Sequence, residues 1–174
     1  AGRRLTRAHP TVQALPMLAD VSTRYSDLVE SVFSSAIAGK AWLATGALVL
    51  AVVQVLTASR MWGKLERFVP LSFGTSRRIH RWSGRIALLL TLPVFFHCVT
   101  ILGFQTPDAR VAVHSIAGSF VYGVVAAKLL VIRHRSRNYA PWVLPVLGGS
   151  LAAVLTTLWL TSSLWYFTNV RFGF

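Results

Sequence analysis

Uncharged apolar stretches alternate with charged segments along the chain, and this alternation predicts four membrane-spanning helices. The stretches without Asp, Glu, Lys or Arg are 41–59, 86–107, 111–127 and 138–170. A helix needs roughly 20 apolar residues to cross a bilayer, where its backbone must satisfy its own hydrogen bonds. The expected spans are about 38–60, 78–104, 109–133 and 143–168. The predicted fold class is therefore an all-α, integral membrane four-helix bundle.

Turn and cap residues mark the predicted starts of three of these helices. Gly74-Thr75-Ser76 precedes the second span and Thr106-Pro107-Asp108 precedes the third. Pro141 and Pro145 mark the start of the fourth. Such residues stop one helix or cap the next.

The chain divides into an N-terminal arm, residues 1–35, and a four-transmembrane-helix domain, residues 36–174. Residues 1–19 contain three Arg and no acid. That charge suits the remainder of a targeting segment, an arm on anionic lipid, or a solvated or partner-bound tail. The arm is expected to be extended or amphipathic, with a short interfacial helix over Tyr25–Phe33.

Composition separates this chain from soluble and nucleic-acid-binding proteins. Its 174 residues include 18 Lys and Arg against five Asp and Glu, a formal charge of +13, yet 54% are hydrophobic. A nucleic-acid-binding domain of that charge would be polar throughout, so we expect no nucleic-acid partner. A soluble domain of this size could not bury so much apolar surface. The single cysteine, Cys98, excludes an intrachain disulfide and a cysteine zinc cage.

The basic residues cluster on one predicted side of the bilayer. Those in the first and third connections are Arg60, Lys64, Arg67, Arg77, Arg78, Arg81, Arg133, Arg135 and Arg137. By the positive-inside rule these connections are cytoplasmic and both termini are non-cytoplasmic. A bacterial plasma membrane is expected, with an organelle inner or thylakoid membrane as the alternative.

His97 and His114 are the candidate functional pair. They lie in adjacent predicted spans at similar distances from the connection near residues 105–106. In an antiparallel hairpin this places both imidazoles ~8–10 Å inside the membrane edge. Two imidazoles at one depth on adjacent helices are what an axially ligated haem b requires. Gly118, one turn after His114, would let a flat macrocycle approach the helix.

Other interpretations of these histidines stay open. Each imidazole could instead hydrogen-bond a neighbouring helix, or contact a metal or a quinone. Pro93, one turn before His97, removes a helical hydrogen bond and is expected to bend its helix.

A second haem is an alternative at the opposite membrane edge. His80 begins the second span and His134 ends the third, so the two lie near one edge. Arg78, Arg81 and Arg85 would there contact haem propionates or lipid phosphates.

Two resemblances accompany these patterns. The stretch H-R-W-S-G-R at residues 80–85, followed by F-F-H ending at His97, resembles the second helix of cytochrome b561-like and ferric-reductase-like membrane domains. This resemblance implies a histidine-bearing helix pair that holds haem b, and it carries over to His97 and His114. The segments TLPVFFHC, VHSIAGSFVYG, LPVLGG and LWLTSSLWYF resemble more closely an uncharacterised actinobacterial family of small four-helix membrane proteins.

The sequence thus predicts a membrane b-type cytochrome that exchanges electrons with a quinone or a partner redox protein. We expect an electron-transfer protein, a subunit of a membrane redox complex, rather than a self-contained enzyme. The alternative is a cofactor-free accessory subunit of a larger membrane complex.

Overall fold

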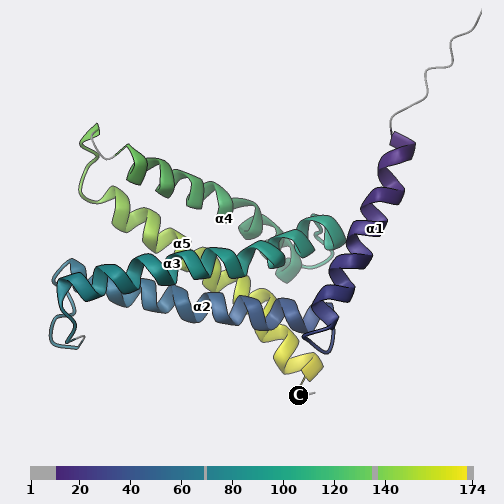
Figure 1. The fold of residues 1–174 in the computed structure, drawn as a ribbon, viewed down its shortest axis with the longest axis horizontal. Helices are drawn as coiled ribbons and strands as arrows, with labels where there is room; N and C mark the ends of the chain where they lie inside the picture. The colour runs from purple at the N-terminus through teal and green to yellow at the C-terminus, as the bar shows by residue number, and fades with distance from the viewer. Residues whose placement is uncertain (1–10, 69, 135–136, 172–174) are drawn as a thin grey trace, which may run out of the picture. The chain divides into compact units, whose positions relative to one another are not determined.

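The described part of the chain is all-helical. A computed structural model describes residues 11–68, 70–134 and 137–171. Its elements are α1 (Thr11–Glu30), α2 (Ala36–Met61), α3 (Phe73–Phe96), η1 (His97–Leu102), α4 (Ala109–Arg133), α5 (Val143–Trp159), η3 (Leu160–Leu164) and η4 (Phe167–Arg171) (Figure 1). The η segments are π-helical turns that extend α3 and α5. Residues 3, 4, 7, 9 and 135, which carry basic or histidine side chains, lie outside the described residues.

Four helices are long and apolar enough to cross a membrane. They are Ala36–Met61, Phe73–Leu102, Ala109–Arg133 and Val143–Val170. This confirms the predicted fold class and fits an integral membrane protein.

The side chains of the bundle are distributed as in a protein that faces lipid. Large apolar residues point outward, for example Leu89 (63% exposed) and Phe120 (61%). The buried apolar positions include small residues, among them Ala41, Ala47 and Ala87. Small residues let helix backbones approach closely where lipid removes the hydrophobic drive for association.

Two helix starts show which cap residues the chain uses. Asp108 Oδ1 accepts from the Val111 N–H at 2.8 Å, so the third apolar helix begins as predicted. Ser72 Oγ accepts from the Thr75 N–H at 3.1 Å and starts α3 at Phe73. Gly74-Thr75-Ser76 therefore lies inside the first turn of α3, and its assignment as the preceding stop was wrong. In both helices a side-chain oxygen one residue before the first turn accepts from a backbone N–H that the helix itself leaves unpaired.

The backbone pattern changes one turn after Pro93. The His97 N–H bonds the carbonyls of both Pro93 and Val94, and the π-helical segment η1 starts at His97. Proline removes one helical donor, and π turns are a common site of helix distortion. His97 therefore sits where α3 departs from regular geometry.

Threonine hydroxyls join each helix of the bundle to the next. Trp159 Nε1 donates to Thr45 at 2.8 Å, and Tyr122 donates through its hydroxyl to Thr91 at 3.1 Å. Imidazole Nδ1 atoms take the same role in the pairs His80–Thr57 and His114–Thr161, both at 3.0 Å. Each of the four threonines also donates to a carbonyl of its own helix. We call these pairs the four threonine latches, and they link α2–α3, α3–α4, α4–η3 and α5–α2.

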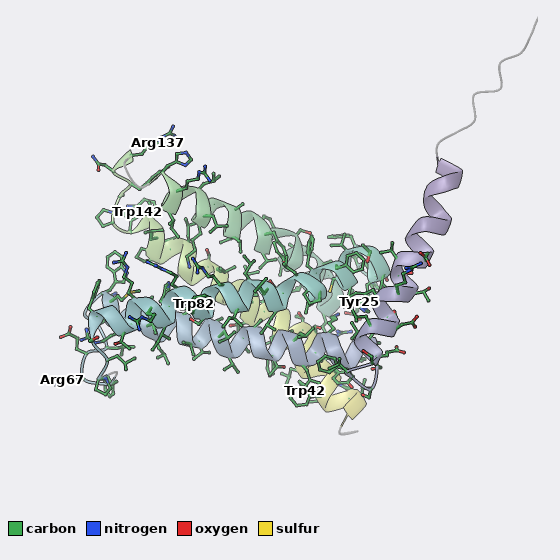
Figure 2. All side chains as sticks on the ribbon, in the orientation of Figure 1. Tyr25, Trp42, Arg67, Trp82, Arg137 and Trp142 are labelled. Atoms are coloured by element: carbon green, nitrogen blue, oxygen red, sulfur yellow. The ribbon has the colours of Figure 1, made fainter. Side chains whose placement is uncertain are left out.

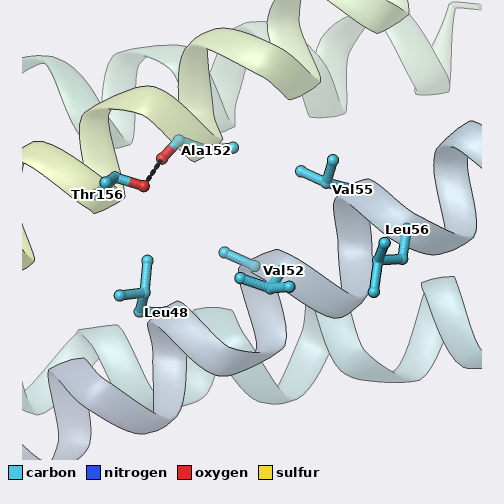
Figure 3. A pocket seen from close by; sticks show the side chains of 7 residues that line it. Leu48, Val52, Val55, Leu56, Ala152 and Thr156 are labelled. Carbon is cyan, nitrogen blue, oxygen red and sulfur yellow. Dashed lines mark hydrogen bonds between the residues drawn. The ribbon is translucent and has the colours of Figure 1, made fainter.

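An apolar pocket of about 160 Å³ lies between α2 and α5. It is lined by Leu48, Ala51, Val52, Val55, Leu56, Ala152 and Thr156, and the α2 side chains face those of α5 (Figure 3). The Thr156 hydroxyl donates to the Ala152 carbonyl at 2.9 Å, so it presents little unsatisfied polarity to the pocket.

The chain forms two compact units, residues 1–39 and 40–174. In the first unit α1 begins well before Tyr25 and ends before Phe33, so the predicted helix over Tyr25–Phe33 was wrong in both bounds. The chain then turns, and Ser35 Oγ accepts from the Ala38 N–H at 3.1 Å to start α2. A Cβ at Gly39 would lie only 2.5 Å from Val29 Cγ1, so glycine is needed for this close approach.

Candidate functional site

His97 is a buried imidazole within a helix that is long and apolar enough to span a membrane. Its side chain is 3% exposed, at the junction of α3 and η1. An ionisable group at such a position is costly and is usually functional or firmly bonded.

His114 on α4 is held by a threonine of η3. Its Nδ1 lies 3.0 Å from Thr161 Oγ1, and the Thr161 hydroxyl donates to the Thr157 carbonyl at 2.7 Å. Because the threonine proton is used on the backbone, the hydroxyl oxygen accepts and the imidazole proton sits on Nδ1. Nε2 then carries the lone pair. Metal-ligating histidines show this arrangement, in which the other ring nitrogen donates to a fixed acceptor.

Contacts between α3 and α4 set the relative depth of the two histidines. The rings of Phe95 and Tyr122 are 4.3 Å apart between centroids, and Tyr122 also bonds Thr91. Counting outward from these contacts brings His97 level with about residue 118 of α4. His114 therefore lies about one turn, ~6 Å, nearer the connecting loop than His97. His97 lies at the junction of α3 and η1, whereas the His114 imidazole is directed at η3, so the two imidazoles differ in surroundings as well as in depth.

The surroundings of the pair are cationic. Lys40 of α2 interacts electrostatically with both His97 and His114. Arg110, one turn before His114, donates to the Thr161 carbonyl at 2.7 Å. Its guanidinium also lies 4.6 Å from the Trp165 ring centroid and 3.9 Å from the Asp108 carboxylate. Sequence reasoning missed Lys40, Arg110 and Thr161 as neighbours of the histidines.

Gly118 faces α5. A Cβ built there would have Leu158 Cδ2, at 3.8 Å, as its neighbour. The glycine predicted to receive a macrocycle thus borders the α4–α5 contact.

His80 lies in a separate polar cluster that reaches from α3 to α2. Its Nδ1 pairs with Thr57, and Thr57 donates to the Val53 carbonyl at 2.6 Å. The Gln54 amide donates to the His80 carbonyl and, at 2.7 Å, to Ser83 Oγ. Lys128 of α4 interacts electrostatically with His80. Thr57 and Gln54 carried a usable signal, since polar residues in an apolar span mark helix contacts.

His134 has different surroundings from His80. It follows α4 as the C-cap residue, and its Nδ1 is 3.0 Å from the Leu130 carbonyl of its own helix. The imidazole of His80 is instead directed at α2. The structure thus gives the two members of the predicted second haem site unlike partners.

The predicted propionate or phosphate ligands lie at the N-terminal end of α3. Arg78 and Arg81 line a pocket of about 520 Å³ with Gly74, Arg77 and Trp82. Arg85 stacks over the Trp82 ring at 5.1 Å. Even Arg85 is 12 residues from His97, or ~18 Å along a helix. These arginines therefore lie at the His80 end of α3, the membrane edge for which they were predicted as ligands, and not at its His97 end.

The donor set suits haem better than a bare metal ion. Within the described ranges, no three His, Cys, Asp or Glu side chains gather as a metal site. Haem iron needs only two axial ligands because the porphyrin supplies the other four. His97 and His114 supply this number and kind of ligand, but their offset of about one turn, ~6 Å, departs from the equal depth expected from the sequence.

Comparison with known proteins gives one family relation. The model of a family of unknown function, DUF6529, matches residues 12–174. No curated protein and no solved structure matches the chain. The relation to cytochrome b561-like and ferric-reductase-like domains stays a prediction from residues 80–97.

Proposed function

Because the chain belongs to the family of unknown function DUF6529, we propose its function from its own residues. The chain is a membrane b-type cytochrome that carries single electrons through one haem b ligated by His97 and His114. The observation that carries this proposal is the bond between His114 and Thr161, which leaves the Nε2 lone pair of a membrane-embedded imidazole for a metal.

Bound haem would supply a reversible one-electron iron couple in this site. The residues of the chain would orient the ligands, exclude water and set the local charge. The Thr161 hydroxyl fixes the orientation of the His114 ring, and burial of His97 keeps water from the second imidazole. The nearby cations Lys40 and Arg110 favour the form of the site with one more electron. Electrons would pass to or from a quinone or a redox partner in a membrane complex.

Absorbance spectroscopy tests this function directly. Purified, haem-replete wild-type protein should show Soret and α bands that change between the oxidised and reduced states. Both His97→Ala and His114→Ala should lose this change, whereas the matched control His134→Ala should retain it. A wild-type preparation without any such band would overturn the proposal. Loss in His134→Ala together with retention in His97→Ala would move the site to the other membrane edge.

A cofactor-free accessory subunit is the second candidate function. It is favoured by the latch between His80 and Thr57, in which an imidazole serves to bond a neighbouring helix. In that case the histidine variants would lose thermal stability without any spectral change, and the protein would copurify with partner chains of a membrane complex.

A further inference from the structure

The first turns of α3 concentrate positive charge without an acid to balance it. Arg77, Arg78, Arg81 and Arg85 all belong to α3, whose sequence contains no Asp or Glu. The ion pairs among the described residues involve Arg24, Arg60 and Arg110. Glu66, the acid of the preceding loop, bonds Arg60 at 2.7 Å.

The arginines of this cluster repel one another. Arg77 and Arg81, four residues apart, lie on one helix face, where like charges are unfavourable. An external anion would remove this penalty, and arginine suits a phosphate because its planar fork donates two parallel hydrogen bonds.

The shape and position of this arginine cluster indicate which kind of anion it binds. The pocket of about 520 Å³ is lined by Gly74, Arg77, Arg78, Arg81 and Trp82. Trp82 is 56% exposed and is labelled on α3 in Figure 2. Tryptophan favours the level of lipid headgroups, with its ring against the glycerol and acyl region. The pocket lies at one end of a helix apolar enough to span a membrane, where lipid phosphates lie.

We propose that this arginine pocket binds the phosphate of an anionic phospholipid, with Trp82 against the glycerol and the upper acyl chain. The site does not depend on haem, since it lies at the opposite end of α3 from His97.

Lipid titration of the detergent-solubilised full chain, followed by native mass spectrometry, tests the site. Wild-type protein should retain phosphatidylglycerol in preference to phosphatidylcholine. The triple variant Arg77→Gln/Arg78→Gln/Arg81→Gln should bind phosphatidylglycerol at least about tenfold more weakly. The matched control Lys64→Gln/Arg133→Gln/Arg137→Gln loses the same charge from the same predicted membrane side and should stay within about twofold of wild type.

Three outcomes would overturn the proposal. Equal losses in the two triple variants would indicate a diffuse charge effect. Equal retention of both lipids by the wild type would show that the pocket does not select a headgroup. Displacement of the lipid by an equal concentration of inorganic phosphate would assign the pocket to a free anion.

If the triple glutamine variant fails to fold, a variant that preserves the positive charge tests the phosphate site instead. Arg77→Lys/Arg78→Lys/Arg81→Lys keeps the charge but loses the forked geometry. It should bind phosphatidylglycerol several-fold more weakly than wild type, and unchanged binding would count against a built phosphate site.

Discussion

At the level of single residues, a threonine hydroxyl in this bundle can satisfy two polar groups at once. Thr161 accepts from His114 and donates to the carbonyl of Thr157, so one hydroxyl satisfies two polar groups inside a membrane-spanning segment. An unsatisfied polar group in such a place costs more than the bond itself contributes.

Thr161→Val should therefore destabilise the protein by about 1 kcal/mol, because it removes the hydroxyl partner of His114 and leaves the imidazole only the Leu158 carbonyl. Thermal unfolding in detergent measures the change, and Thr161→Ser should restore most of the loss. The control is Thr157→Val, since the Thr157 hydroxyl bonds only the Ala153 carbonyl of its own helix. A Thr161→Val protein as stable as Thr157→Val would contradict the role of this latch.

At the residue scale, the sequence singles out residues whose burial in an apolar span is costly. His97 and His114 stand out because an ionisable group in an apolar span is expensive. Thr161 did not stand out, because threonine is common in such spans and its partner lies on another helix. The sequence alone does not show which helix holds the partner of such a threonine.

At the level of helices, Tyr122 of α4 contacts α3 through both its hydroxyl and its ring, and we call this contact the α3–α4 seam. Tyr122 donates to Thr91 and packs its ring on Phe95. The relative depth of His97 and His114 follows from this seam. Equal spacing from the loop could not predict the offset, because η1 replaces regular helix after Pro93.

Removing the tyrosine hydroxyl tests this seam. Tyr122→Phe keeps the ring and should cost about 0.6 kcal/mol, a typical value for a hydrogen bond between membrane helices. A double-mutant cycle with Thr91→Val, read by denaturant unfolding in detergent, isolates the coupling. Additive effects of the two substitutions would show that the pair does not interact.

The turn between α1 and α2 depends on the missing side chain of Gly39. A Cβ there would lie 2.5 Å from Val29 Cγ1 and 3.1 Å from Phe33 Cδ2. Gly39→Ala should loosen residues 31–35 and raise the rate of limited proteolysis there several-fold, and Val29→Ala should relieve the effect. Gly149→Ala is the matched control, because nothing lies within 4 Å of a Cβ at that position. Equal proteolysis of the two alanine variants would argue against crowding at Gly39.

At the level of the whole molecule, the charges divide the bundle into two unlike ends. Figure 2 labels Arg67, Arg137 and Trp142 at one end of the helices and Trp42 at the other. Most of the described basic residues lie in the connections α2–α3 and α4–α5 or in the adjoining parts of the helices, namely Arg60, Lys64, Arg67, Arg77, Arg78, Arg81, Arg133 and Arg137.

Cysteine labelling in intact cells tests the predicted orientation. With Cys98 replaced by serine, Phe68→Cys should react only after the membrane is permeabilised, and Thr106→Cys should react with a membrane-impermeant reagent from outside. The positive-inside rule gives this direction. The reverse pattern would place both termini in the cytoplasm.

The four spans could be predicted because hydropathy and charge are properties of a segment on its own. The neighbours of each helix could not, because apolar residues are spread around α2 and α5 and their few polar residues do not show which helix they contact. The residues of the candidate site could likewise be predicted only where they belong to a single span. Its histidines could be found within their spans, but Lys40 and Thr161 approach from other helices.

The threonine latches have a consequence for how the chain can be cut. Each apolar helix is bonded to its predecessor and its successor, and Trp159 with Thr45 closes the series from the last helix to the first. Side-chain hydrogen bonds, as well as the loops, then determine which helices are neighbours. Two separately expressed fragments, divided in the loop between Met61 and Phe73, should therefore reassociate in a membrane with native neighbours. The connecting peptide would set only the local concentration of the pieces.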